Sequence, residues 1–209
     1  MIELRRRYSG IKGSDSPSFS RLPAGYQEVE YLESTGTQYI ELEKTMSADI
    51  TKIILEYEMQ TGSIVNYLIS AASNSAGFLI GYRTDLGKAR IFFGDNVNPY
   101  GDFEMNTGKS YRLEIAANHT TAYLKLNGEN VLVLDGIIFN NRNIKLLHYF
   151  GNSGIFKLKY VKIECSKDIE LIPCYRKYDD TAGMYDLVSG EFYTNAGTGE
   201  FIVGPEIIG

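Results

Sequence analysis

The chain has 209 residues, of which 44% are hydrophobic and 22% are charged, and its formal net charge at pH 7 is −5. This length suits one domain with a full core, alone or with short appended segments. A mildly acidic surface has no overall attraction for nucleic acid or anionic lipid. No apolar run reaches the roughly 18 residues that a membrane-spanning helix needs. The basic start lacks an apolar stretch behind it, so we expect no secretory signal and synthesis in a cytoplasm.

Residues 1–24 differ in composition from the rest of the chain. A compact basic cluster, LRRRY, precedes a stretch rich in Ser, Gly and Pro that is typical of a linker. We predict a basic N-terminal arm and linker, residues 1–24, that docks onto a neighbouring subunit or an acidic groove; a disordered tail is the alternative. Nucleic acid is not an expected partner, because three arginines alone would bind it weakly. The predicted anchoring residues are Ile2, Leu4, Arg5, Arg6, Arg7 and Tyr8.

From Tyr26 onward the apolar residues recur with a period of two, which predicts β-strands rather than helices. These short segments carry β-branched and aromatic residues and are separated by Gly, Asn and Asp. Asn127 and Gly128 both tolerate positive φ, so they predict a hairpin turn. The pattern indicates an all-β, antiparallel sandwich. In chain order, the expected strands are 28–34, 37–43, 51–60, 66–72, 77–83, 89–95, 111–117, 121–127, 130–136, 143–150 and 156–165.

The stretch 174–204 is dense in tyrosine, glycine and small polar residues, which raises the question of a binding site. GMYDLVSGEFYTN predicts a hairpin with Ser189 and Gly190 at its turn, and AGTGEF supplies two glycines for a bend into a last strand, 201–203. Pairing of that strand with residues 33–42 would cover an exposed sheet edge. We therefore predict that the C-terminal hairpin, 182–204, closes the fold structurally.

Two stretches resemble the start and end of a known module: LPAGYQEVEYLESTGTQYIEL (Leu22–Leu42) and LIPCYRKYDDTAGMYDLVSGEFYTNAGTGEF (Leu171–Phe201). The module is a jelly roll found in phage, prophage and gut-bacterial proteins, and is similar to concanavalin A-like and laminin-G-like folds. The middle stretch, YRLEIAANHTTAYLKLNGENVLVL, resembles a laminin-G hairpin. This resemblance implies an antiparallel jelly-roll β-sandwich over residues 25–209, with an extended N-terminal arm.

Concanavalin-like folds include glucanases, whose catalytic acids lie in a Glu-x-Asp-x-x-Glu pattern on one strand. EVEYLE, with Glu28, Glu30 and Glu33, resembles this pattern, but a glutamate replaces the central aspartate. Glu56 and Glu58 form a second same-face pair that lacks a third acid. The chain also has no tryptophan, which is prominent in sugar subsites. We therefore expect no catalytic residues and no enzymatic activity.

The loop 94–102 combines acidic, amide and aromatic side chains that would hydrogen-bond sugar hydroxyls or hold Ca²⁺; a polar loop without a ligand is the alternative. No metal is expected there, because the spacing matches no 12-residue calcium loop. Cys165 and Cys174 form no CxxC motif, so they do not predict zinc; we expect reduced thiols, with a disulfide as the alternative. No cofactor is expected. The candidate glycan-binding residues are Asp95, Asn96, Asn98, Tyr100 and Asp102.

Together these features predict a non-enzymatic phage virion protein, made in the cytoplasm of a bacterial host. It would be a capsid decoration, head-fibre or tail component, anchored by its arm to other virion proteins and to copies of itself. The sandwich would then face outward. The alternative is a carbohydrate-binding adhesion module for host or mucosal glycans.

Overall fold

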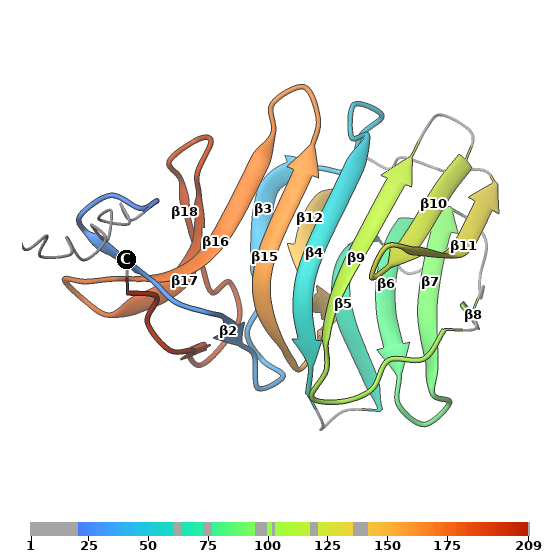
Figure 1. The fold of residues 1–209 in the computed structure, drawn as a ribbon, viewed down its shortest axis with the longest axis horizontal. Coiled ribbons are helices and arrows are strands. Elements are labelled where there is room, and N and C mark those ends of the chain that lie inside the picture. Colours follow the sequence, from blue (N-terminus) through green and yellow to red (C-terminus); the bar gives the residue numbers. More distant parts are fainter. Residues whose placement is uncertain are drawn as a thin grey trace, which may run out of the picture.

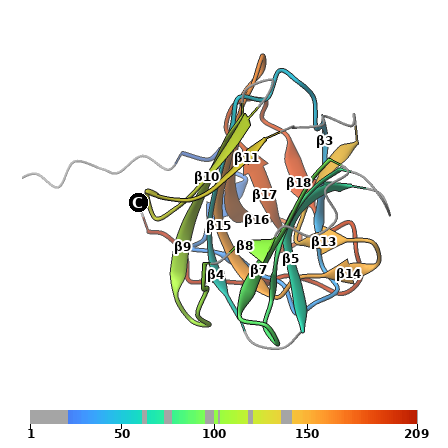
Figure 2. The same ribbon diagram turned by 90° about the vertical axis from the view of Figure 1, so that its right-hand side faces the viewer.

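The computed structural model describes residues 21–60, 64–72, 77–94, 100–101, 103–117, 121–135 and 142–208. Within these ranges the chain is all-β, and two antiparallel sheets lie face to face as the layers of a sandwich (Figure 1, Figure 2). The described ranges hold no helix that is long and apolar enough to cross a membrane.

Among the described residues, eleven strands form the larger sheet, whose main path runs β11-β10-β9-β4-β15-β16-β17-β18. Three short strands pair at its margin, β1 with β16, and β2 with both β15 and β19. The strands are β1 (Tyr26–Glu28), β2 (Leu32–Glu33), β4 (Lys52–Met59), β9 (Ser110–Ala117), β10 (Thr121–Leu126), β11 (Glu129–Asp135), β15 (Phe156–Glu164), β16 (Ile169–Arg176), β17 (Thr181–Asp186), β18 (Phe192–Thr194) and β19 (Ile202–Val203).

The smaller sheet has six strands in the described part of the chain, in the order β3-β12-β5-β6-β7-β8. A separate two-stranded hairpin, β13–β14, packs beside β5 on the outer side of this sheet (Figure 2). The strands are β3 (Ile40–Thr45), β5 (Val65–Ala72), β6 (Gly77–Arg83), β7 (Lys88–Gly94), β8 (Tyr100–Gly101), β12 (Asn143–Leu146), β13 (His148–Tyr149) and β14 (Asn152–Ser153).

The core lies between the two sheets and is built by the alternation of the strands. On β10, Leu124 and Leu126 are buried while Tyr123 is exposed, as the alternation of side chains along a strand requires. On β4, the fully buried Tyr57 packs edge-on against Phe156, with ring centroids 5.6 Å apart. Each such fully buried apolar side chain contributes about 1.5–3 kcal/mol.

Backbone conformation at a few residues explains which predicted strands are continuous in the structure and which are interrupted. Asn127 and Gly128 have φ of 51° and 88°, so the predicted hairpin turn between β10 and β11 is confirmed. The single predicted strand 28–34 is wrong: β1 ends at Glu28, because Val29 bridges to Glu206 in the C-terminal segment. The predicted strand 143–150 is also interrupted, because Leu147 has a φ of 65° and turns the chain from β12 into β13.

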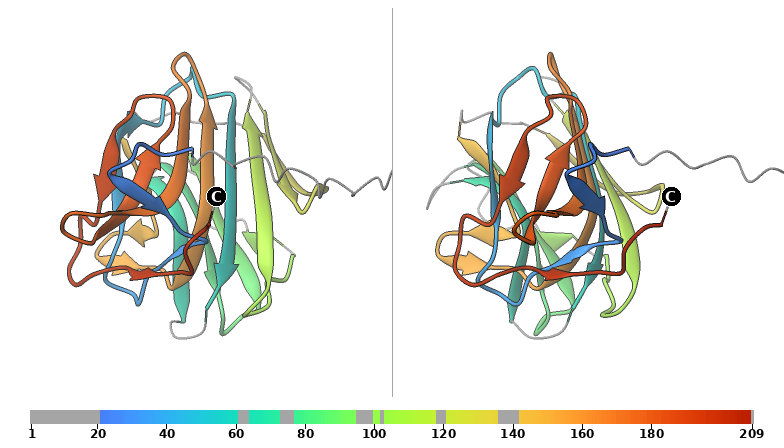
Figure 3. Two further views of the ribbon diagram at one scale, coloured as in Figure 1. Left: turned by 60° about the vertical axis from the view of Figure 1, so that its left-hand side comes forward. Right: turned by 90° about the vertical axis from the view of Figure 1, so that its left-hand side faces the viewer.

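The chain closes where its C-terminal segment runs beside its first strands, as Figure 3 shows in dark red and blue. The closing segment, residues 195–206, contacts the stretch between Glu28 and Tyr39 throughout its length. Ile202 pairs with Glu33, and the Thr198 amide donates to the Thr37 carbonyl at 3.2 Å. The last strand therefore pairs at the start of the predicted partner stretch, residues 33–42: Ile202 lies opposite Glu33, while Val203 lies opposite Leu32, one residue before it.

Candidate functional site

Most site residues predicted from the sequence lie outside the described ranges. Tyr100 begins β8, but only its backbone is described. The anchoring role and the glycan-binding loop therefore stay predictions. The predicted residues outside the described ranges are Ile2, Leu4, Arg5, Arg6, Arg7, Tyr8, Asp95, Asn96, Asn98 and Asp102.

The glutamates of EVEYLE do not share the face of one strand. Glu28 is buried at the end of β1 and accepts hydrogen bonds from the Arg21 guanidinium, whereas Glu30 is exposed after β1 has ended. Glu33 belongs to a different strand, β2. The break at Val29 therefore removes the alternation on which the glucanase-like pattern depends.

The second glutamate pair, Glu56 and Glu58 on β4, is engaged in ion pairs. Glu56 pairs with Arg112, and Glu58 lies 3.3 Å from the Lys157 ammonium. Burial acts to raise the pKa of Glu58, but hydrogen bonds from Gln60 and Lys157 outweigh it, so the pKa is lowered. A carboxyl with a lowered pKa is ionised at neutral pH and is a poor general acid.

A cleft of about 460 Å³ lies on the outer face of the smaller sheet, where the β13–β14 hairpin meets β3, β5 and β12. Its wall combines charged, amide and aromatic side chains from segments that are far apart in the sequence. We refer to it as the hairpin cleft. It is lined by Glu41, Ser70, Ala72, Arg142, Asn143, Lys145, His148, Tyr149, Phe150 and Gly151.

Strand register places the polar floor of the hairpin cleft. Lys145 on β12 lies directly opposite Glu41 on β3 and Ser70 on β5, so the three residues form one cross-strand row. The Lys145 ammonium is 3.3 Å from the Glu41 carboxylate, which also accepts a 3.3 Å hydrogen bond from the Asn143 amide. The row lies on the outer side of the sheet, because its strand neighbours Ile40 and Leu146 are buried in the core. Glu41 and Lys145 are partly exposed there, whereas Ser70 is buried against the hairpin.

The β13–β14 hairpin is fastened to β5 by hydrogen bonds from both ends. The Ser70 hydroxyl donates to the His148 carbonyl, and the Leu147 amide donates to the Leu68 carbonyl at 2.8 Å. After β14, the Ile155 amide donates to Oδ1 of the buried Asn66 at 3.1 Å. These bonds hold the cleft wall in one position relative to its floor.

His148 joins the hairpin to the floor. Its ring stacks on Tyr39, with centroids 4.1 Å apart and planes 22° apart, while the Lys145 ammonium lies 5.4 Å from the same tyrosine ring. Nε2 of His148 accepts from the Gly151 amide at 3.4 Å, and Nδ1 lies 3.1 Å from the Ser153 hydroxyl. Burial, followed by the charge of Lys145, lowers the pKa of His148 below its ordinary 6.5, although Glu41 acts in the opposite direction. The imidazole is therefore neutral at pH 7.

Aromatic side chains form the outer rim of the hairpin cleft. Phe150 sits at the hairpin turn with a φ of 47° and is 65% exposed. Tyr149 packs against Tyr67 with ring centroids 5.1 Å apart, and Phe150 lies 6.1 Å from Tyr149. A large ring held outside the core beside polar groups offers apolar contact area to a ligand.

None of these cleft residues was singled out from the sequence. The stretch from Asn143 to Phe150 reads as one continuous strand, which hides the turn at Leu147. The signal that could have found the hairpin is the run HYF followed by GNSG, in which aromatic residues directly precede turn residues. The juxtaposition with Glu41 and Ser70 depends on sheet register and has no local sequence signal.

A second cleft, about 540 Å³, lies between the closing segment and the β16–β17 turn, and two of its polar side chains, Asp179 and Asn195, are engaged by protein groups. The Arg176 guanidinium donates to both oxygens of Asp179, at 3.1 and 2.6 Å, and lowers the pKa of that carboxyl to about 2. Asn195 Oδ1 accepts from the Tyr39 and Gly197 amides, and its Nδ2 donates to the Gly199 carbonyl. This region stabilises the fold and is the weaker candidate for a binding site.

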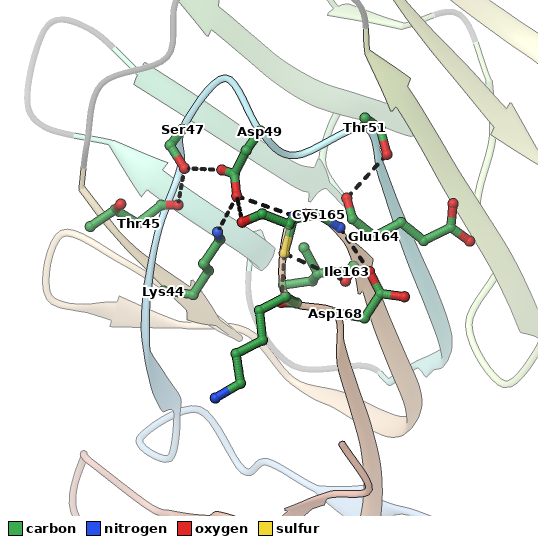
Figure 4. Close-up of polar contacts among 11 residues, drawn as sticks. Lys44, Thr45, Ser47, Asp49, Thr51, Ile163, Glu164, Cys165 and Asp168 are labelled. Carbon is green, nitrogen blue, oxygen red and sulfur yellow. Dashed lines mark hydrogen bonds and ion pairs between the residues drawn. The ribbon is translucent and has the colours of Figure 1, made fainter. Parts of the chain in front are cut away.

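A third polar cluster joins the β3–β4 loop to the β15–β16 turn (Figure 4). Asp49 accepts from the Lys44 ammonium at 2.8 Å, the Ser47 hydroxyl at 2.5 Å and the Ser166 hydroxyl at 2.6 Å. The bond from Lys44 is the largest of the effects that hold the pKa of Asp49 far below its ordinary value. Nearby, the Cys165 thiol is free and donates to the Lys167 carbonyl at 2.8 Å. The Asp49 oxygens are filled by protein donors, so this cluster acts as a connection between loops.

The described residues include no group of three or more His, Cys, Asp and Glu side chains that could hold a metal ion. Cys174 is a free, buried thiol, and burial raises its pKa to about 12.

Comparison with known proteins defines the fold. No protein-family model matches the chain, and no curated protein sequence matches it. A solved SAP-like pentraxin from Limulus polyphemus, described as heptameric, has a TM-score of 0.54 at 12% identity, covering 88% of this chain and 95% of the pentraxin. A "putative carbohydrate binding protein" from Bacteroides ovatus has a TM-score of 0.56 at 9% identity, covering 85% of this chain and 60% of that protein. The chain has a jelly-roll fold of the concanavalin A-like type. The predicted fold class is thereby confirmed.

Proposed function

We propose that the protein is a carbohydrate-binding module that acts without catalysis and binds its ligand in the hairpin cleft. The observation that carries this proposal is the exposed Phe150 ring in the same cleft as the partly exposed side chains of Glu41 and Lys145. A pyranose presents C–H groups on its faces and hydroxyls around its edge. An aromatic ring next to fixed donors and acceptors complements both features.

Two further points support this proposal. Hydrogen bonds to β5 fix the hairpin before any ligand arrives, so ordering the cleft costs little on binding. The similarity to the Bacteroides ovatus protein is one of fold, and that protein is named a "putative carbohydrate binding protein".

We also propose that the carbohydrate-binding module is carried on a phage virion. A capsid-decoration, fibre or tail protein that presents its sandwich outward would bring the hairpin cleft to host or mucosal glycans. Many weak sites on one particle would then act together through avidity. The arm of residues 1–24 as the anchor stays a prediction of the sequence.

The direct test is a glycan array followed by calorimetry with Phe150→Ala. We expect the variant to keep its thermal stability and to bind the best array ligand about tenfold more weakly or worse, because the apolar platform is lost. Tyr178→Ala is the matched control: Tyr178 is 77% exposed, lies in the β16–β17 turn outside the cleft, and should leave affinity unchanged.

Two results would contradict this assignment. Equal affinity of Phe150→Ala and the unaltered chain would remove the hairpin cleft from the binding site. Loss of binding in Asn98→Ala instead would place the site in the 94–102 loop that the sequence predicts.

A further inference from the structure

We propose that the arm segment, residues 1–20, docks onto an exposed apolar strip at the end of its own chain. We call this surface the C-terminal strip, and it consists of Ile202, Val203, Ile207 and Ile208. The inference is independent of the proposed carbohydrate-binding function. The strip lies at the margin of the larger sheet, whereas the hairpin cleft lies on the outer face of the smaller sheet.

The C-terminal strip gathers much of the apolar surface that the fold leaves exposed. Eleven large apolar side chains are exposed in the described ranges, and four of them lie within residues 202–208. Backbone pairing holds this segment against residues 28–33, from Ile202 opposite Glu33 to the Ile207 amide, which donates to the Glu28 carbonyl at 3.0 Å. Aliphatic side chains gathered on a fixed segment indicate a surface that a partner covers.

The backbone of the strip is also open on one side. Among the described strands, β19 pairs only with β2, so its other edge can accept an extended segment. In the arm segment, Ile2 and Leu4 are two residues apart in the sequence MIELRRRY. An extended conformation would therefore place both side chains on one face.

The two parts of the chain that build this margin are acidic and contain no cations. Residues 22–43 hold five Asp and Glu residues, residues 178–209 hold six, and neither range has a Lys or Arg. In the described ranges, three of these acids form ion pairs with cations from elsewhere in the chain: Glu28, Glu41 and Asp179. The remaining acids leave this margin with a net negative charge.

The uncompensated acids include two that adjoin the strip. Glu206 accepts from the Tyr175 hydroxyl at 2.5 Å, and this neutral donor leaves its charge in place. Glu30 is exposed beside the closing segment and has no basic partner among the described residues. Strand register places Lys157 in the same row as Ile202, but its ammonium is already 3.3 Å from Glu58.

The arm segment complements this surface in both charge and apolar groups. Its first eight residues hold three arginines and one acid, together with Ile2, Leu4 and Tyr8. Arginine forms strong hydrogen bonds with carboxylates, and each fully buried aliphatic side chain contributes about 1.5–3 kcal/mol. The predicted anchoring residues would then be held by their own chain, and a virion partner would compete with the strip for them.

The arm segment joins the described chain beside the strip. Arg21 donates to the Glu28 carboxylate, and the carbonyl of the same glutamate accepts from Ile207. Figures 2 and 3 show the first described residues, in blue, on the same side of the molecule as the C-terminus. A linker with the Gly- and Ser-rich composition of residues 9–20 would span about 20 Å, the length of about six extended residues. Docking within one chain thus has an effective concentration near the millimolar range, above that of second copies in dilute solution.

The experiment uses the absence of tryptophan from the chain. In the full chain with Tyr8→Trp, the single indole reports the environment of the arm segment, and a peptide of residues 1–20 with the same substitution reports the free state. A docking constant of about 0.1 mM against an effective concentration of about 1 mM would leave about nine arms in ten docked. We expect blue-shifted emission and an acrylamide quenching constant at least about twofold lower than that of the peptide. Part of this protection should be lost between about 50 mM and about 300 mM salt.

Substitutions in the strip locate the docking surface. Val203→Ser and Ile207→Ser, each in the Tyr8→Trp chain, should raise the quenching constant toward that of the peptide. Val133→Ser is the matched control and should leave it unchanged. Val133 is also a valine on an edge strand of the larger sheet, β11, and is 55% exposed against 42% for Val203. Urea denaturation of each variant checks that the fold is retained.

Three results would overturn the proposal. An indole as accessible as in the free peptide would show that the arm segment is not docked. Protection that survives both strip substitutions would place the arm segment elsewhere on the fold. Protection that rises with protein concentration, together with a doubled mass in light scattering, would make the occupant the arm segment of a second copy.

Discussion

The closing segment and the β13–β14 hairpin both contain asparagine, glycine and a phenylalanine, but they use their polar groups differently. In the closing segment the amide of Asn195 makes three hydrogen bonds to backbone groups. In the hairpin, Phe150 is mostly exposed, and Lys145 below it keeps a third of its side chain in solvent. The presence of asparagine and glycine beside an aromatic residue therefore does not by itself indicate binding. What indicates binding is whether the tertiary structure has already used the polar groups.

The two regions also meet at one residue. The Tyr39 amide donates to Asn195 Oδ1 at 3.1 Å, and its carbonyl accepts from the Ala196 amide at 2.9 Å. The ring of the same tyrosine stacks under His148 in the hairpin cleft. The closing segment thus holds Tyr39 against His148, which lines the cleft, although neither Tyr39 nor the closing segment lines it.

The largest expected effect comes from Gly197→Ala in the closing segment. A Cβ at this position would lie 2.0 Å from the Thr37 carbonyl oxygen and 3.0 Å from Cδ1 of Tyr39, so the backbones must separate. We expect the free energy of unfolding to fall by about 3 kcal/mol or more, measured by urea denaturation. Gly25→Ala, where a Cβ meets nothing within 4 Å, is the control and should change it by less than about 0.5 kcal/mol. A loss below about 1 kcal/mol for Gly197→Ala would show that the closing segment is not tightly packed.

A smaller effect is expected from Asn195→Ala, which tests the connection between the two regions. The Tyr39 and Gly197 amides lose their acceptor, so the free energy of unfolding should fall by about 1–3 kcal/mol. The variant should also alter the ring-current shift of the His148 protons in NMR spectra, because Tyr39 is no longer held beneath the imidazole. Asn195→Asp keeps the acceptor oxygen and should restore that shift in part. An unchanged His148 signal in Asn195→Ala would show that the closing segment and the cleft are independent.

The smallest effect concerns His148 and is confined to the hairpin. The pKa of His148 is lowered in the folded state, so below its ordinary value of 6.5 the unfolded chain binds more protons. The contribution of the neutral imidazole to the free energy of unfolding is therefore fully present above pH 6.5. It is lost as the pH falls toward the folded-state pKa. The stability of the unaltered chain should decline more between about pH 7.5 and about pH 5.5 than that of His148→Gln, as measured by urea unfolding. Parallel profiles for the two proteins would contradict a buried, neutral His148.

The fold class followed from the sequence because its causes are local. Alternation on β4 and β10 and the Asn127-Gly128 turn are each written within a few residues. The positions of the breaks in 28–34 and 143–150 were not predictable in this way. Val29 leaves its strand because of a partner that lies 177 residues later, Glu206, and Leu147 adopts positive φ in spite of its side chain, in a segment held by the Leu68 carbonyl.

Strand period and turn residues act over short distances, so the amino-acid sequence is enough to predict an all-β sandwich whose last strand returns to its N-terminal region. The hairpin cleft, in contrast, depends on how the strands pair in the folded chain. Glu41, Ser70 and Lys145 come from three strands, and they face one another because inter-strand register places them in one row. Register depends on the packing of whole sheets rather than on any local pattern, so a site made across strands becomes visible only in the folded chain.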